Sequence, residues 1–296
     1  MARIRIAVTG RNGQVARSLA ERAVGTDIDV TCIGRPELDL GKADTIALAP
    51  IVADVLVSAA AYTDVNKAEA EPDLADLINS RAPGLLAGRA NALGIPLIHL
   101  STDYVFDGSK PGQYVEDDAL GPINAYGRSK AAGERAVAAA HPRHIILRTS
   151  WLYSPFGRNF VRTMLELARN QDTVRVVADQ VGNPTAAVDI AGGILALARH
   201  LIEGRGDERY GTFHMAAAGA ASWAEIAAAV FAASAKRGGP TARVVPIPST
   251  EYQTPARRPA NSRLDGAKIA RLYGIALPPW QPSLERCVDR ILEQGA

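Results

Sequence analysis

Cysteine is almost absent from this sequence: among its 296 residues there are two, Cys32 and Cys287. Two thiols so far apart in the chain make neither a disulfide framework nor the clustered ligands of a zinc knuckle. Such sparse use of cysteine is typical of proteins from a reducing compartment. We therefore expect two reduced, partly buried thiols and no metal site.

The sequence also lacks a charge imbalance and a long hydrophobic run. Lysine and arginine total 33 against 31 aspartates and glutamates, so the formal net charge is +2. This balance gives no electrostatic reason to bind nucleic acid or a membrane. No apolar run reaches the ~18 residues that a membrane span needs, and the N-terminus leads into a strand-like segment rather than a signal peptide. We expect a cytoplasmic protein without nucleic-acid or membrane partners.

What the sequence does contain is an alternation of β-branched runs and helical patterns. Strands are expected at 4–9, 29–33, 55–58, 95–100 and 144–148, and helices at 14–21, 74–92 and 126–140. Strands separated by helices form βαβ units with right-handed crossovers, and such units build a parallel sheet. The prediction is an α/β protein with a Rossmann-like, doubly wound parallel sheet.

The pattern loosens after Trp151, where a smaller and less regular lobe is expected. Helices are predicted at 159–168 and 186–201, short strands at 213–215 and 244–247, and a surface loop at 246–259. We divide the chain into a Rossmann domain, residues 1–150, and a C-terminal lobe, residues 151–296, some segments of which return to the first domain. The motifs below assign the cofactor to the first part and the substrate mainly to the second.

A glycine turn joins the first strand to the first helix. The residues of this turn that we expect to contact a cofactor are Gly10, Asn12, Gly13, Gln14 and Val15. Glycine tolerates positive φ and lets a pyrophosphate approach the backbone, and the N–H groups at the helix start favour phosphate. A plain tight turn is the alternative, because such a pattern alone is weak evidence. Its position at the first strand-to-helix junction favours a dinucleotide.

The end of the second strand indicates which dinucleotide would bind. Proteins that bind NAD usually carry an acidic residue there for the ribose 2′-OH, whereas this chain has Gly34 followed by Arg35. An arginine suits a 2′-phosphate, which favours NADPH. NADH stays as the alternative, because arginine is mostly a solvated surface residue. Further residues expected beside the cofactor are Asp39, Leu40, Ala59, Ala60, Ala61 and Thr63.

Tyr126 and Lys130 stand four residues apart in a predicted helix, so they lie on one face about one turn apart. A free tyrosine has a pKa of about 10 and is a poor acid–base catalyst at neutral pH. A lysine ammonium ~4 Å away, at an effective dielectric constant of about 20, favours the phenolate by about 4 kcal/mol, or roughly three pKa units. We expect Lys130 to lower the pKa of Tyr126, and both residues to contact the cofactor. The alternative is an ordinary exposed helix pair.

Thr102 follows the fourth predicted strand, at the carboxyl edge of the sheet where ligands bind. Its hydroxyl group can form a hydrogen bond with a substrate carbonyl or with the tyrosine oxygen. Capping of the next turn is the structural alternative.

A family resemblance rests on seven stretches that occur in order along the chain. They are Gly10-x-x-Gly13-Gln14-Val15, Ala59–Glu69 (AAAYTDVNKAE), Ser101–Phe106 (STDYVF), Tyr126-x-x-x-Lys130, Arg148–Tyr153 (RTSWLY), Gly182–Thr185 (GNPT) and Arg258–Leu264 (RPANSRL). Together they resemble the dTDP-4-dehydrorhamnose reductases, a family of extended short-chain dehydrogenases/reductases, from Ile4 to about Trp280.

The resemblance implies reduction of dTDP-4-dehydro-β-L-rhamnose to dTDP-β-L-rhamnose, the last step in making this sugar donor, by hydride transfer from a nicotinamide to C4. It implies that Tyr126 donates the proton, that Lys130 also holds the nicotinamide ribose, and that Thr102 orients the carbonyl group. Residues that it places against the nucleotide sugar are Thr102, Asp103, Trp151, Asn159 and Arg258. Core packing is the alternative for Trp151, because tryptophan is highly buried on average.

The chain departs from the family pattern at two positions. Gly34-Arg35 replaces the acidic strand end of some members, which again favours NADPH. Some members pair through glutamates that hold magnesium at a dimer interface, and one of these would fall where this chain has Arg17-Ser18. This argues against Mg²⁺ here and leaves both a monomer and a homodimer open.

Two other functions fit parts of the pattern. Another nucleotide-sugar 4-ketoreductase, an epimerase or a 4,6-dehydratase would use the same scaffold. The dehydratases typically carry Asp-Glu after the threonine, where this chain has Asp103-Tyr104. A non-catalytic, NADP-binding regulatory subunit would keep the fold without the chemistry. The intact Thr102, Tyr126 and Lys130 argue against that alternative, although the fold alone does not decide between them.

Overall fold

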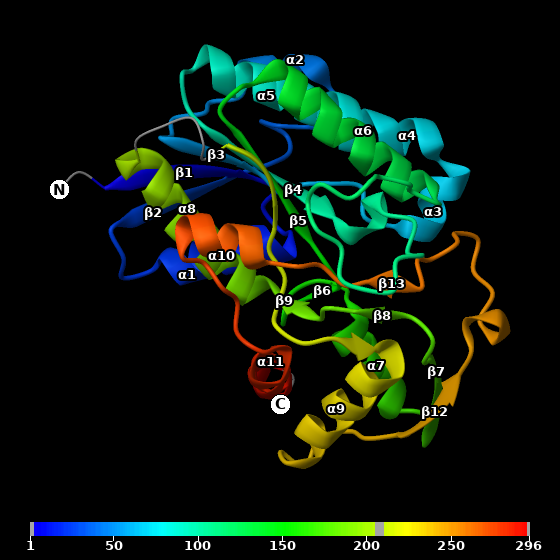
Figure 1. Cartoon of the computed structure of the whole chain (residues 1–296). Helices are drawn as coiled ribbons and strands as arrows, with labels where there is room; N and C mark the ends of the chain where they lie inside the picture. The colour runs from blue at the N-terminus through cyan, green and yellow to red at the C-terminus, as the bar shows by residue number, and fades with distance from the viewer. Residues whose placement is uncertain (1–2, 205–209, 295–296) are drawn as a thin grey trace.

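The computed structural model describes residues 3–204 and 210–294, and a parallel six-stranded sheet lies at its centre (Figure 1). Its order is β2-β1-β3-β4-β5-β10. The strands are β1 (Ile4–Thr9), β2 (Ile28–Ile33), β3 (Val55–Ser58), β4 (Leu97–Thr102), β5 (His144–Thr149) and β10 (Gly211–His214). Because β1 lies between β2 and β3, the chain changes direction across the sheet at this point, and ligands of open α/β sheets bind outside the carboxyl ends of the strands there.

Helices cover both faces of the sheet (Figure 1). One face packs against α1 (Gln14–Ala23), α8 (Ala187–Glu203) and α10 (Ala267–Tyr273). The other packs against α2 (Ala43–Leu48), α5 (Ala82–Ala92) and α6 (Ala125–Ala140). Each face buries its own cluster of branched aliphatic side chains, so the prediction of a doubly wound, Rossmann-like sheet is confirmed.

The long helix predicted at 74–92 is divided by a π-helical turn. It consists of α4 (Pro72–Asp76), the turn Leu77–Arg81 and α5, and the short α3 (Val65–Ala70) precedes it. Within the turn, the Asn79 amide accepts the Tyr62 N–H at 2.8 Å and donates to the Tyr62 carbonyl at 2.9 Å and to Ser129 Oγ at 3.0 Å. This fully bonded, buried amide ties the loop after β3 and the helix α6 together.

We propose that the remaining elements form the lobe predicted after residue 150. Its helices are α7 (Phe160–Ala168), α9 (Trp223–Ala235) and α11 (Trp280–Gln294). Its strands are β6 (Leu152–Tyr153) with β9 (Thr185–Ala186), β7 (Thr173–Val177) with β12 (Arg243–Ile247), and β8 (Val181–Gly182) between β11 (Ala221–Ser222) and β13 (Asn261–Ser262). The lobe has a hydrophobic cluster of its own, whereas β10, α8 and α10 pack with the large sheet. We propose a boundary at residues 150 and 151, with these three elements returning to the first domain.

The strand predicted at 244–247 corresponds to β12, so the loop predicted at 246–259 begins only after Ile247. Pro246 and Ile247 belong to β12, which pairs in parallel with β7, and a short 3₁₀ turn follows at Ser249–Glu251. Because β12 has a single partner in a two-stranded sheet, the missing N–H of Pro246 costs no ladder bond on its open side.

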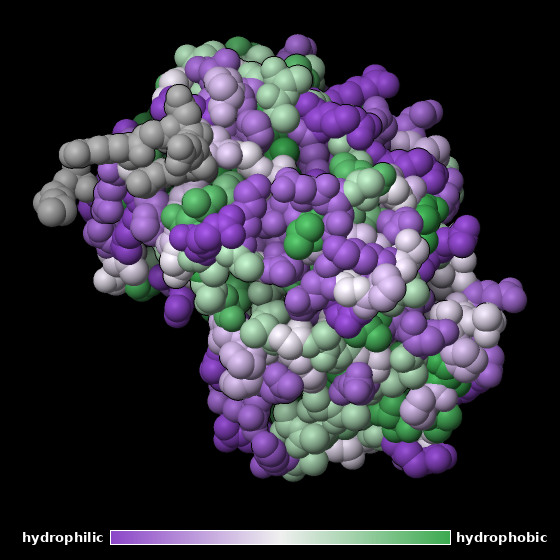
Figure 2. Space-filling view, in the orientation of Figure 1, coloured by the Kyte–Doolittle hydropathy of each residue, from purple (hydrophilic) through white to green (hydrophobic). Residues whose placement is uncertain are grey.

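Figure 2 shows hydrophilic residues over most of one face, with hydrophobic ones gathered over the part where α7 and α9 lie. No helix in residues 3–204 and 210–294 combines the length and apolarity that a membrane crossing requires.

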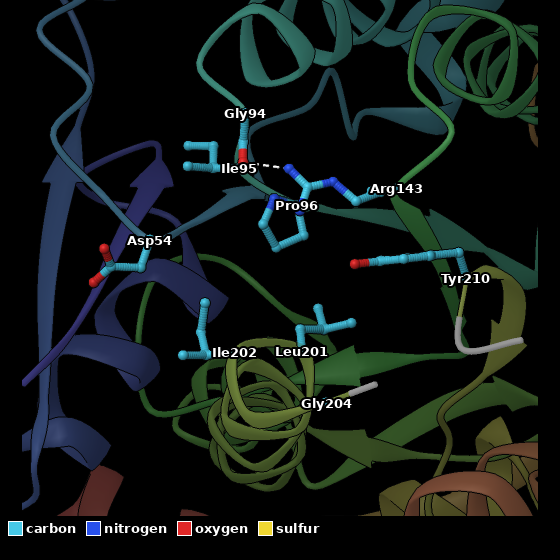
Figure 3. A pocket seen from close by; sticks show the side chains of 9 residues that line it. All are labelled: Asp54, Gly94, Ile95, Pro96, Arg143, Leu201, Ile202, Gly204 and Tyr210. Carbon is cyan, nitrogen blue, oxygen red and sulfur yellow. Dashed lines mark hydrogen bonds between the residues drawn. The ribbon is translucent and has the colours of Figure 1, made fainter. Parts of the chain in front are cut away.

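A pocket of about 450 Å³ is lined by residues that include Asp54, Pro96, Arg143 and Tyr210, each of which precedes a strand (Figure 3). It therefore lies at the amino edge of the sheet, away from the carboxyl ends.

The close contact of α6 with the π turn generates a first prediction. A Cβ atom on Gly133 of α6 would collide with the Asn79 carbonyl oxygen, whereas a Cβ on Gly88, inside α5, would meet nothing within 4 Å. We expect Gly133→Ala to lower the free energy of unfolding by about 2–3 kcal/mol, because the helices must move apart. Gly88→Ala should raise it by up to about 1 kcal/mol, because alanine is the better helix former. Urea unfolding measures both, and equal effects would contradict the packing described.

Candidate active site

The glycine turn after β1 has the geometry of a phosphate site. Gly10 has a φ of +92°, and a Cβ atom there would also lie 3.3 Å from the Cβ of Ala60. Gly13 is the N-cap of α1 and provides no side-chain cap, and a Cβ there would meet nothing within 4 Å. The first N–H groups of α1 therefore stay open to an anion at the positive end of the helix.

The other residues of the turn take different places. Asn12 is exposed, whereas Val15 is buried in the core beneath the sheet. Gln14 reaches into the second lobe, where its Oε1 accepts from Ser154 Oγ at 2.7 Å and from Asn159 Nδ2 at 3.1 Å. The cofactor turn is thus hydrogen-bonded directly to the segment that begins α7.

Two arginines meet beside the end of β2: Arg35, which follows this strand, and Arg11 of the glycine turn. Arg35 is exposed, and its carbonyl accepts from Arg11 Nη1 at 3.4 Å. Arg11 packs over Gly34, where a Cβ would lie 3.2 Å from Arg11 Cγ, and it forms a 2.8 Å ion pair with Glu37. Arg11 is not among the residues predicted from the sequence, although its position inside the glycine turn was a usable signal. Either guanidinium suits a 2′-phosphate.

The segment after β3 lies beside the glycine turn, where Ala60 approaches Gly10. The N–H groups of Ala59 and Ala60 both donate to Thr9 Oγ1 at 3.0 Å, which fixes the ends of β1 and β3 relative to each other. Ala61 is half-buried and Thr63 is exposed. These small side chains follow β3, which lies next to β1 at the switch point.

Asp39 and Leu40 lie after β2. The Asp39 carboxylate accepts the Gly41 N–H at 3.0 Å, and Leu40 is buried in the core on the α5 side. Leu40 therefore offers its backbone rather than its side chain to a ligand.

Tyr126 is in the first turn of α6, and three contacts hold that turn. The Asn124 side chain caps the helix by accepting the Gly127 N–H at 2.7 Å, and Glu69 Oε1 accepts the Ala125 N–H at 2.7 Å. A Cβ on Gly127 would collide with the Tyr104 carbonyl oxygen. Glu69 ends the AAAYTDVNKAE stretch, so one role of that stretch is to fix the start of α6, which the sequence analysis missed.

Tyr126, Thr102 and Asp103 meet where β4 ends. Thr102 Oγ1 donates to Asp103 Oδ1 at 3.0 Å and accepts the Tyr104 N–H at 3.2 Å. Burial, followed by the charge of Asp103, raises the pKa of Tyr126, and a hydrogen bond with Thr102 opposes this rise. The phenol is therefore held in its protonated form.

Lys130 does not act on Tyr126 as predicted. Its Nζ donates to the Leu100 carbonyl at 2.6 Å and lies 3.3 Å from His99 Nε2. Burial lowers the pKa of Lys130 to about 8, against the charge of Glu134, which raises it. Because the ammonium is bound to β4, it does not offset the burial of the phenol, and the pKa of Tyr126 is raised rather than lowered.

Asp103 is the most perturbed carboxyl group of the site. It is 3% exposed, and burial raises its pKa to about 7, although nearby Ser262 and Thr102 lower it. In the described part of the chain, neither Asp103 Oδ2 nor the Ser262 hydroxyl has a hydrogen-bond partner. Unpaired polar atoms at this depth are uncommon in proteins, and a water molecule or a polar ligand group can satisfy them.

The indole ring of Trp151 packs against Trp223 and Gly182 and is not exposed on a face. Its φ of +47° is in the left-handed region, which is unusual for a bulky side chain. Trp223 stacks on its indole at 3.7 Å with an interplanar angle of 10°, and a Cβ on Gly182 would lie 2.6–3.0 Å from three atoms of the same ring system. With Trp223 on one side and Gly182 on the other, the indole offers an edge, not a face, to a sugar. No spacing in the sequence signalled Trp223.

The two residues predicted to reach the diphosphate differ. Arg258 is half-buried and lies beside Tyr104, whose raised pKa it lowers, and among the described residues its Nε has no hydrogen-bond partner. Both ends of the Asn159 amide already have hydrogen-bond partners: its oxygen caps α7 by accepting the Arg162 N–H, and its nitrogen donates to Gln14 and Ser154. Arg258 is thus available for an anion in this structure, and the Asn159 side chain is not.

The helix position discussed for magnesium carries an arginine. Arg17 lies over the Phe156 ring, with its Cζ 3.9 Å from the centroid. In the part of the chain that the structure describes, no group of three or more histidine, cysteine, aspartate or glutamate side chains could hold a metal ion.

The comparisons with known proteins agree on one family. The model of the RmlD substrate binding domain matches residues 4–293. A dTDP-4-dehydrorhamnose reductase of Sinorhizobium fredii is 48% identical over 99% of both chains. The enzyme of the same name from Escherichia coli K12 is 38% identical over 98% of this chain and 99% of its own.

Solved structures of dTDP-4-dehydrorhamnose reductases are similar to this chain over nearly its whole length. The one from Clostridium acetobutylicum has a TM-score of 0.89 at 34% identity, over 98% of this chain and 100% of its own. The one from Bacillus anthracis, in complex with NADP, has a TM-score of 0.88 at 34% identity, over 97% of this chain and 99% of its own. A dTDP-glucose 4,6-dehydratase of Streptomyces venezuelae, at 19% identity and a TM-score of 0.78, shares the fold.

The burial of Asp103 generates a prediction about pH and stability. Because its pKa of about 7 lies above the usual ~3.9, the folded protein binds this proton more tightly than the unfolded chain. The resulting stabilisation is complete below about pH 4 and is lost as the pH rises through 7. Asp103→Asn removes this dependence. The free energy of unfolding of the variant, relative to that of the wild type, should therefore rise by about 2 kcal/mol as the pH increases from about 5 to 7. Denaturant unfolding at several pH values measures the gap, and a constant gap would refute the shift.

Proposed function

This chain belongs to the dTDP-4-dehydrorhamnose reductase family, and on that premise we propose that it reduces dTDP-4-dehydro-β-L-rhamnose to dTDP-β-L-rhamnose with NADPH. This reaction is the last step of dTDP-rhamnose synthesis. The observation that carries the proposal for this chain is the meeting of Thr102, Asp103 and Tyr126 at the end of β4, on the edge of the sheet that also carries the glycine turn. An assay that follows NADPH absorbance with freshly made dTDP-4-dehydrorhamnose, against other 4-keto sugar nucleotides, tests it.

The cofactor fits the residues at the carboxyl edge of the sheet near the switch point. Gly10, Gly13 and the uncapped start of α1 would take the diphosphate, and Arg35 or Arg11 the 2′-phosphate. When bound, NADPH supplies the hydride. The chain must then hold the carbonyl group in place, provide a proton and keep water away.

Tyr126 is suited to be the proton donor. Its phenol is protonated in the cofactor-free protein and lies beside Thr102, as a proton donor to the C4 oxygen must, and its raised pKa has to fall in the complex for the proton to be released readily. Thr102 is beside it and offers a second hydroxyl group for orienting the carbonyl. The proton leaves a phenolate behind, and the hydrogen bond with Thr102, which lowers the pKa of Tyr126, favours that anion.

Arg258 and Trp151 are our candidates for binding the nucleotide sugar. Among the described residues the buried Nε of Arg258 has no hydrogen-bond partner, and it suits a diphosphate oxygen because hydrogen bonds between charged groups are the stronger ones. The clamped indole of Trp151 would limit the space beside the sugar ring. We keep Asn159 as a candidate only if its bond to Gln14 opens.

The alternatives lack support at particular positions. A 4,6-dehydratase would need a second acid after Asp103, where Tyr104 stands, buried. A regulatory subunit would not need the protonated phenol beside Thr102. We keep a cytoplasmic location and a monomer or homodimer without required Mg²⁺ as predictions.

Tyr126→Phe should fold and bind NADPH normally but turn over at least ~100-fold more slowly, the low end for a general acid. Stopped-flow or steady-state NADPH oxidation measures this, with NADPH fluorescence for binding. Tyr252→Phe, at an exposed tyrosine, is the matched control. Near-normal turnover of the Tyr126 variant would remove it from the mechanism.

Arg35→Ala should weaken NADPH binding by about tenfold, the loss of one charge-assisted contact, and leave NADH binding nearly unchanged. Fluorescence titration with both cofactors measures the difference. Arg11→Ala is the companion variant, since Arg11 contacts the same strand end. Equal losses for both cofactors in both variants would contradict a 2′-phosphate site here.

A further inference from the structure

His99 is a buried histidine that the mechanism above does not use. It lies within β4 with no exposed surface. Its Nδ1 is 3.1 Å from Ser58 Oγ of β3, and its Nε2 is 3.3 Å from Lys130 Nζ of α6. The ring therefore bridges the strand next to the switch point and the helix that carries the proton donor.

The partners of the ring fix its protonation. An ammonium group has donors only, so the nitrogen facing Lys130 must be an acceptor. The proton of the neutral ring is then on Nδ1, which donates to Ser58 Oγ. Burial, followed by the charges of Lys130 and of His144 in β5, holds the pKa of His99 well below its usual range, so the ring stays neutral.

Lys130 has few other ways to satisfy its donors. The Leu100 carbonyl takes one N–H and His99 Nε2 a second, which leaves one of the three. Glu134, one turn further along α6, is occupied by Arg148 Nε at 2.9 Å and Nη2 at 2.7 Å. Glu134 acts on Lys130 through its charge, and β4 supplies the direct acceptors.

We propose that His99 is a positioning residue: its neutral imidazole accepts one N–H of Lys130 and, with the Leu100 carbonyl, fixes the ammonium so that one N–H remains for the nicotinamide ribose. The proposal rests on the proposed function for the identity of that last partner. The bond between His99 and Lys130 exists without cofactor or substrate and is tested independently of them.

The first experiment measures the histidine tautomer in the cofactor-free protein. Two-dimensional ¹H–¹⁵N spectra of the ring nitrogens, with His99→Gln used for assignment, should show a neutral ring protonated on Nδ1 from about pH 5 to 8, on both sides of the usual histidine pKa. In Lys130→Met the ring should lose this fixed tautomer or begin to titrate. Protonation on Nε2 in the wild type, or spectra unchanged in Lys130→Met, would overturn the proposal.

The second experiment compares three variants by their pH profiles. His99→Leu leaves a buried N–H of Lys130 unpaired, which disfavours the ammonium, so the alkaline limb of kcat and of NADPH affinity should move down by about one pH unit. His99→Gln retains an acceptor and should recover most of the wild-type profile. The control is His141→Leu, another fully buried histidine, whose Nε2 contacts the Ile95 carbonyl at 2.9 Å near the amino edge of the sheet.

The outcomes separate the two proposals. If His99→Leu and His141→Leu lose stability alike and keep the wild-type profile, His99 is only structural. If the protein fails to reduce any 4-keto sugar nucleotide while the tautomer and the pH dependence of NADPH binding follow the expectation, the proposed function fails and the positioning of Lys130 stands.

Discussion

The active site depends on how closely helix α6 approaches its neighbours. Near its start, Gly127 leaves no room for a side chain against the Tyr104 carbonyl, and further along Gly133 does the same against the π turn at Asn79. These two contacts fix both the position and the rotation of the helix. Side chains four residues apart, such as Tyr126 and Lys130, then point from one face toward the carboxyl end of β4.

The burial of these side chains, more than their pairing with charged neighbours, sets the pKa values at this face of α6. The phenol of Tyr126 and the carboxyl group of Asp103 have raised pKa values, and the pKa of Lys130 is lowered, with burial as the largest cause in each case. Each shift favours the neutral form, which is costly for folding and useful in a site that must exclude water and deliver a proton. The unpaired atoms of Asp103 and Arg258 fit the same account, since a charged, polar substrate would satisfy them.

The sequence predicts the scaffold well, because buried strands and amphipathic helices have periods that a single segment displays. Tyr126 and Lys130 are on one helical face as their spacing predicts, but the orientation of the ammonium is decided by His99 and the Leu100 carbonyl of another element. Trp223 was missed for the same reason: its partner is at the end of β5. The strands of two residues, such as β8, exist only through their pairing and have no pattern of their own.

The protonation of Tyr126 is the most direct test of this account. Tyrosine labelled with ¹³C at Cζ, with Tyr126→Phe for assignment, reports ionisation of each phenol during a pH titration of the cofactor-free protein. The account predicts that Tyr126 is still protonated at about pH 10, where an ordinary tyrosine is half ionised. Ionisation below about pH 9 would show that the neighbouring charge outweighs burial, and would contradict the geometry described for Lys130.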